Sequence, residues 1–93
     1  MRGWPASDFV AVTGAEKLLE RMRANPRDWR IGDVEAVCRV EGVTCTPPRN
    51  GSHFKVKHAE VREILTIPAH RPIKPVYIRA LVRFLDVVRE KRR

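Results

Sequence analysis

The stretch Asn50-Gly51-Ser52-His53-Phe54-Lys55-Val56-Lys57-His58 begins with a strong turn signal and continues with strict alternation of side-chain type. Asn-Gly is a dipeptide that tight β-turns favour, and Gly51 can adopt the positive φ angle of such a turn at little cost. Because successive side chains of a strand point to opposite faces, the pattern predicts a strand over 52–58. Its apolar face, with Phe54 and Val56, suits a core, and its polar face carries His53, Lys55 and Lys57.

Two helices are predicted before this strand. The first begins near Thr13, where Glu16 completes a capping box, and ends at Asn25-Pro26, because the residue before proline disfavours the α region. The second spans about 32–41 and ends at Gly42, which suits a left-handed C-terminal cap. We expect Trp29 to pack between the two helices, and residues 1–12 to form a flexible N-terminal tail.

After Gly42 the hydrophobic period changes from helical to alternating, which predicts a short strand over 43–46 with Val43 and Cys45 facing inward. A third strand is predicted over 63–67, after a turn at 59–62. The proline-rich connector 68–75 then leads to a final helix over about 76–90, because Pro75 suits the start of a helix.

The predicted order is therefore ααβββα, an α+β fold in which helices pack on one face of a three-stranded antiparallel sheet. Short loops between the strands favour an antiparallel meander, and the helices can cover only one of its faces. We predict a single domain over 13–93, with the row His53, Lys55 and Lys57 on its solvated face.

The net charge of +8 favours an anionic partner. Residues 1–46 hold seven basic and seven acidic residues, whereas residues 47–93 hold twelve basic and four acidic ones. The whole excess therefore lies in the half that contains the His53 strand. We expect phosphate groups to bind along this half, with His70, Arg71 and Lys74 of the connector as further contacts.

Several other classes of protein are disfavoured. Cys38 and Cys45 are too few for a disulfide framework and are predicted to be small core side chains. No metal cofactor is expected, because His53 and His58 lie on opposite faces of the strand and no Cys-x-x-Cys or His-x-x-x-His spacing occurs. No apolar run reaches the length of about 18 residues that a membrane span needs. The N-terminus also lacks an apolar secretory segment, and we expect a cytoplasmic protein.

Four features occur together in this order: Glu41-Gly42-Val43, Gly51-Ser52-His53, Thr66-Ile67-Pro68-Ala69-His70, and a final helix. This combination, over about residues 31–90, resembles the HicA-type toxins of bacterial toxin–antitoxin pairs. The resemblance implies a fold like that of double-stranded-RNA-binding domains, cleavage of mRNA, a catalytic role for His53, and inhibition by a cognate HicB-type antitoxin. The chain differs from this pattern in its residues before 31, in the modestly basic loop 47–50, and in Pro75-Val76-Tyr77 at the start of the last helix.

The chemistry expected of this site is general acid–base catalysis. RNA carries its own nucleophile, the 2′-hydroxyl, so His53 would serve as the base or the acid, while Lys55 and Lys57 hold phosphates. Ser52 would orient His53 or bond to the turn, and His70, water or the RNA would supply the second proton transfer. Two alternatives are a non-catalytic RNA-binding module of the same fold and a docking surface for an acidic protein.

Overall fold

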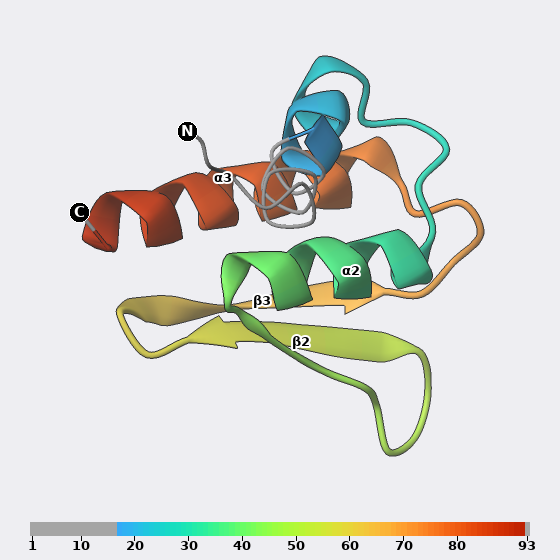
Figure 1. The fold of residues 1–93 in the computed structure, drawn as a ribbon. Coiled ribbons are helices and arrows are strands. Elements are labelled where there is room, and N and C mark those ends of the chain that lie inside the picture. Colours follow the sequence, from blue (N-terminus) through green and yellow to red (C-terminus); the bar gives the residue numbers. More distant parts are fainter. Residues whose placement is uncertain (1–16, 93) are drawn as a thin grey trace, which may run out of the picture.

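The computed structural model describes residues 17–92, and the predicted tail over 1–12 and helix start near Thr13 lie outside the described residues. Helical residues 17–24 come first, followed by α2 (Ile31–Glu41), β1 (Thr44–Thr46), β2 (His53–His58), β3 (Val61–Pro68) and α3 (Pro75–Lys91). The predicted order ααβββα and the α+β class are confirmed (Figure 1).

The three strands form one antiparallel sheet in the order β1-β2-β3, so β2 is the central strand. Val56 of β2 lies opposite Cys45 of β1 and Leu65 of β3. The third strand is longer than predicted and begins at Val61, because His58 pairs with Val61 across a turn of only two residues. An irregularity between Val56 and His58 absorbs the extra residues of β3.

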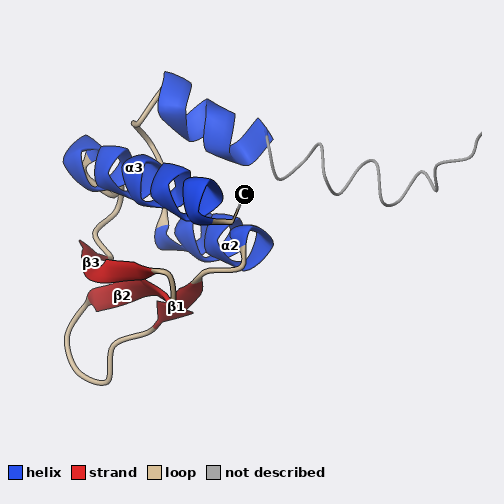
Figure 2. Ribbon diagram, turned by 90° about the vertical axis from the view of Figure 1, so that its left-hand side faces the viewer, coloured by secondary structure: helices blue, strands red, loops and turns tan. Residues whose placement is uncertain are grey.

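The helices all lie on one side of the sheet. Figures 1 and 2 show α2 and α3 directly over the sheet, with the helical residues 17–24 on the far side of these two helices. One buried cluster joins all of these layers. Its members without exposed surface include Leu19, Val34, Val56, Ile67 and Leu85, which come from five different elements.

The helix boundaries follow the local signals in the sequence. Gly42 has φ +73° and caps α2 in the left-handed conformation, and Pro75 occupies the first turn of α3. Asp33 accepts a hydrogen bond from the backbone N–H of Arg30 at 3.0 Å, which satisfies one amide group near the start of α2. Among the described residues, no helix is long and apolar enough to cross a membrane.

The two cysteines are neighbours, and the prediction of small buried core side chains holds for Cys38 but only in part for Cys45. Cys38 of α2 has no exposed surface, and Cys45 of β1 is half-buried. The neighbouring Cys45, together with burial, raises the pKa of the Cys38 thiol. The pair therefore helps to hold α2 against the sheet.

Glu41 joins the ends of α2 and α3, although its side chain is only 4% exposed. Its carboxylate accepts hydrogen bonds from Arg89 at 3.0 and 2.8 Å and from Arg92 at 3.3 Å. Arg92 also donates to the Glu41 backbone carbonyl at 3.1 Å. Arg92, at the C-terminal end of α3, thus compensates a buried negative charge.

We predict that Glu41→Ala destabilises the protein by about 3 kcal/mol, because it removes the anion that two arginines share in a low-dielectric site. Urea unfolding monitored by circular dichroism measures this change. Glu63→Ala is the matched control, since Glu63 is exposed on β3, and we expect it to shift the free energy of unfolding by less than about 0.5 kcal/mol. Equal stability of the two variants would show that the Glu41 cluster contributes nothing.

The helical residues 17–24 are held on α3 by an ion pair between Arg23 and Asp86. The guanidinium donates to both carboxylate oxygens of Asp86 at 2.8 Å. Trp29, just after this segment, is buried as predicted, donates from Nε1 to the Asn25 carbonyl at 2.6 Å, and has the Arg21 guanidinium 5.5 Å from its ring centroid.

The hydrogen bonds from Arg23 hold the pKa of Asp86 below its ordinary value. Because the folded-state pKa is lowered, the pair stabilises the fold above the ordinary carboxyl pKa, and this contribution is lost as the pH falls through the folded-state value. We predict that carboxyl-carbon NMR finds Asp86 titrating at lower pH than in an Arg23→Gln variant. Identical titrations in the two proteins would mean that the pair does not form in solution.

Candidate nucleic-acid interface

The face of the sheet opposite the helices is open, and β2 presents the predicted basic row on it. His53, Lys55 and Lys57 are exposed, whereas the intervening Val56 has no exposed surface. Phe54 is less buried than its apolar character predicts: it is half-buried, near the start of the strand beside the 47–52 loop. The orientation of the row is therefore as predicted, and we call His53, Lys55 and Lys57 the basic row.

Threonines flank the basic row on both neighbouring strands. Lys55 lies opposite Thr46 of β1 and Thr66 of β3, and Lys57 lies opposite Thr44. Directly opposed residues share a face of the sheet, and all three threonines are exposed. Their hydroxyl groups can donate to phosphate oxygens beside each lysine. These threonines were not among the predicted contacts, although the alternation in β1 indicates which of its residues point outward.

The turn before β2 connects the basic row to the connector. Gly51 has φ +82°, as predicted for a turn glycine, and the Ser52 carbonyl accepts a hydrogen bond from the Ala69 N–H at 2.7 Å. His53 is paired in register with Pro68. Residues 69–74, with His70, Arg71 and Lys74, therefore begin directly beside His53.

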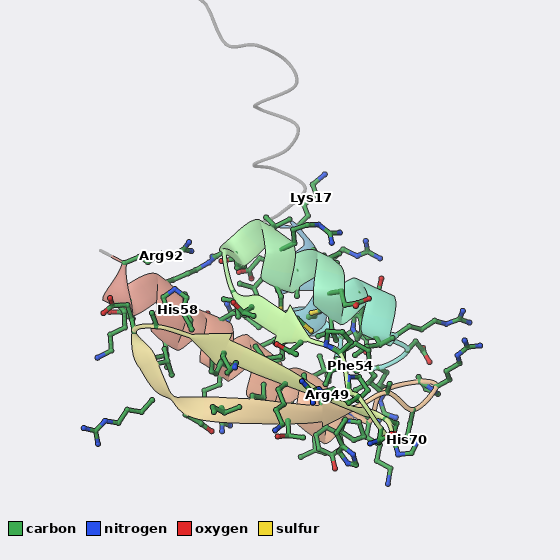
Figure 3. All side chains as sticks on the ribbon, turned by 90° about the horizontal axis from the view of Figure 1, so that it is seen from below. Lys17, Arg49, Phe54, His58, His70 and Arg92 are labelled. Atoms are coloured by element: carbon green, nitrogen blue, oxygen red, sulfur yellow. The ribbon has the colours of Figure 1, made fainter. Side chains whose placement is uncertain are left out.

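Figure 3 shows the open face with its labelled side chains. Arg49, Phe54 and His70 lie toward one end of the sheet, and His58 lies at the other end. Arg49 is exposed in the 47–52 loop and adds a cation at the same end as His70. Arg49 and His70 thus lie at the end of the sheet where β2 begins.

The side chain of Ser52 makes neither of the contacts predicted for it. Within residues 17–92 its hydroxyl bonds neither to His53 nor to the turn, and only its backbone carbonyl is bonded. In the same part of the chain no carboxylate pairs with His53. Both polar groups are therefore available to a bound ligand.

His58 has a structural contact. It is half-buried, and its Nδ1 accepts a hydrogen bond from the Glu60 N–H at 3.0 Å in the turn between β2 and β3. His58 thus lies on the other face of the strand from His53 and at the other end of β2. Unlike that of His53, its imidazole already has a hydrogen-bond partner within residues 17–92.

The connector residues line an open pocket of about 540 Å³, which we call the connector pocket. His70, Arg71 and Lys74 line it together with Pro72, Ile73 and Pro75. Arg27 and Asp28, from the segment between the first helix and α2, complete the lining. These two residues were not predicted, because nothing local in the sequence indicates that residues 27–28 lie beside residues 70–75.

The two segments are joined by the backbone: the Ile73 N–H donates to the Trp29 carbonyl at 2.8 Å. Trp29 is buried and Ile73 has no exposed surface, so this pairing is anchored in the core. Arg27 and Asp28, directly before Trp29, are both exposed and are thereby held at the pocket.

Across residues 17–92, no cluster of three or more His, Cys, Asp or Glu side chains has the arrangement of a metal site. The interface therefore combines one exposed histidine with lysine, arginine and threonine side chains. Such groups bind phosphate and transfer protons. No protein-family model, curated protein or solved structure matches this chain.

We predict that Gly51→Ala destabilises the protein by about 1–2 kcal/mol, because alanine is strained at positive φ even where there is space for its methyl group. A Cβ at Gly51 would meet nothing within 4 Å, so the change tests backbone strain alone. Gly32→Ala is the matched control: its Cβ also meets nothing, and Gly32 is helical.

Urea unfolding of both variants measures the difference. We expect Gly32→Ala to be neutral or stabilising by up to about 1 kcal/mol. A Gly51→Ala protein as stable as the Gly32→Ala protein would rule out the positive φ angle at the start of β2.

Proposed function

We propose that this protein is a metal-independent endoribonuclease that cleaves mRNA, with His53 as the catalytic acid or base. The observation that carries the proposal is the basic row, in which an exposed imidazole stands in line with two exposed lysines on a sheet face that the helices leave uncovered. The proposed RNA-binding residues are Ser52, Lys55, Lys57, His70, Arg71 and Lys74. Gly51 shapes the turn that begins the strand.

The proposed reaction uses the 2′-hydroxyl of RNA as the nucleophile. His53 removes its proton while the 2′-oxygen attacks the adjacent phosphorus, the bond to the 5′-oxygen breaks, and a cyclic phosphate forms. Lys55, with the hydroxyl groups of Thr46 and Thr66 beside it, stabilises the added negative charge. The leaving 5′-oxygen needs a proton, and His70 or water supplies it.

The shape of the interface suits RNA with little sequence preference. An open sheet face binds the phosphate backbone through charge and offers few contacts to base edges. The threonine hydroxyls and lysines of this face are contacts of that kind.

Within this proposal the protein is the cytoplasmic toxin of a type II toxin–antitoxin pair, and its inhibitor is a HicB-type antitoxin. An inhibitor that covers the basic row would block RNA directly. The exposed Ile64 of β3, 54% accessible, adds an apolar contact that a protein partner can bury and that RNA does not need.

The principal alternative is an RNA-binding module of the same fold without catalytic activity. The absence of a carboxylate partner for His53 within the described residues supports this alternative, because catalytic imidazoles are commonly oriented by such a group. The same basic row supports both functions, so cleavage itself distinguishes them.

We predict that the purified protein cleaves labelled RNA in the presence of EDTA, and that His53→Ala lowers the cleavage rate by about 100-fold or more. Removing an exposed side chain should leave the fold intact. His58→Asn is the matched control, since it removes the other imidazole of β2 and keeps a hydrogen-bond acceptor near Glu60. Growth arrest on induction should follow the same pattern.

Cleavage by His53→Ala at the wild-type rate would refute the proposed role. RNA binding with a steep inverse dependence on salt, and no cleavage, would establish the binding module instead. Loss of activity on adding EDTA would show that a metal takes part.

A further inference from the structure

The connector pocket differs from the basic row in shape and in composition. It is concave, and its volume of about 540 Å³ is within the range of about 300–1,000 Å³ of small-ligand sites. Pro72 and Pro75 contribute apolar surface, while Arg27, Arg71 and Lys74 contribute positive charge. A ligand that fits both features has an anionic group and a flat apolar group.

The three cations around the pocket form no ion pairs in the described part of the chain. Within residues 17–92, none of Arg27, Arg71 and Lys74 forms an ion pair with a carboxylate. Lys74 is also the N-cap residue of α3, whose first turn contains no acidic side chain. The positive end of the α3 dipole therefore adds to the attraction for an anion at this pocket.

Asp28 indicates that the ligand carries hydrogen-bond donors as well as an anionic group. It lines the same pocket and has no ion-pair partner among the described residues. A carboxylate repels a phosphate but accepts hydrogen bonds from hydroxyl and amino groups. A nucleotide has both kinds of group, because the amino group of its base donates hydrogen bonds while its phosphate carries the charge.

We propose that the connector pocket binds one unpaired nucleotide of single-stranded RNA, with its phosphate on Arg27, Arg71 and Lys74 and its base against Pro72 and Pro75. The proposal rests on the proposed function, because it places this nucleotide next to the RNA segment that crosses His53. The hydrogen bond between Ser52 and Ala69 joins the end of the basic row to the start of the connector, so one strand can pass from one to the other.

This assignment specifies the substrate class. A base within an A-form duplex is paired and stacked and cannot enter a concave pocket, whereas a base of a single strand can be turned outward. The protein should therefore prefer single-stranded RNA to duplex RNA, although its open sheet face alone would accept either.

The test uses a short, fluorescently labelled 2′-O-methyl RNA strand, alone and as a duplex, with binding followed by fluorescence anisotropy over a range of salt concentrations. This probe lacks the nucleophilic hydroxyl and cannot be cleaved, so binding is measured whether or not the protein is a nuclease. Arg27→Ala and Arg71→Ala test the pocket. Arg83→Ala is the matched control, because Arg83 is exposed on α3 and does not line the pocket.

We expect the wild type to bind the single strand about tenfold more tightly than the duplex. Arg27→Ala should weaken single-strand binding about fivefold and lower the slope of log K against log salt by about one. Its effect on duplex binding should equal that of Arg83→Ala. Arg71→Ala should behave like Arg27→Ala.

Equal binding of the single strand and the duplex, or equal effects of Arg27→Ala and Arg83→Ala on the single strand, would overturn the proposal. Cleavage of unmodified RNA measured in parallel separates the two ideas. If the protein cleaves RNA but Arg27→Ala and Arg83→Ala weaken single-strand binding equally, the proposed function stands and the nucleotide pocket is refuted. If Arg27→Ala weakens single-strand binding more than Arg83→Ala but no cleavage occurs, the pocket stands and the proposed nuclease activity is refuted.

Discussion

Burial of Val56 on the central strand determines which side chains the open face of the sheet presents. Val56 has no exposed surface and lies between Cys45 and Leu65. A shift of the register by one residue would place Lys55 or Lys57 beneath the helices and Val56 in water, which the energies of charge and apolar burial oppose strongly. The exposure of His53 is therefore a consequence of the burial of Val56, three residues along the strand, which fixes the side of the sheet that His53 faces.

The helices reinforce this arrangement from the other side of the sheet. Glu41 ends α2 three residues before β1, and its contacts with Arg89 and Arg92 fix that end against α3. The Cys38–Cys45 contact connects α2 to β1 itself. Positive charge near the C-terminus of α3 is thus partly used in folding, whereas the positive charge at β2 and at the connector remains accessible to a ligand. The total charge of the chain does not distinguish basic residues that stabilise the fold from those that are accessible to a ligand. The presence or absence of a carboxylate partner does.

Much of this fold could be predicted from the sequence because its signals are local. Three of these signals each depend on only a few neighbouring residues. They are the alternation in β2, the positive φ angles of Gly42 and Gly51, and Pro75 at the start of α3. The prediction was wrong at the turn before β3, since the hairpin from His58 to Val61 is tighter than the four residues expected. Contacts between distant segments were not predicted. Two examples are the hydrogen bond from Arg92 to Glu41 and the place of Arg27 and Asp28 in the connector pocket. Both depend on how helices and loops that are distant in sequence pack together.

The same distinction applies to the candidate site. The basic row is a local pattern on one strand and was predicted completely, while its threonine neighbours and the connector pocket required the register and the Trp29–Ile73 pairing. This pairing brings the segment before α2 beside the connector, so that Arg27 and Asp28 line the same pocket as residues 70–75. Charge on the row attracts any phosphate backbone, and selection between single and double strands requires a concave feature beside it. In the proposed nuclease, Arg27 and Asp28 act with the connector in the choice of substrate, while the basic row contributes the chemistry.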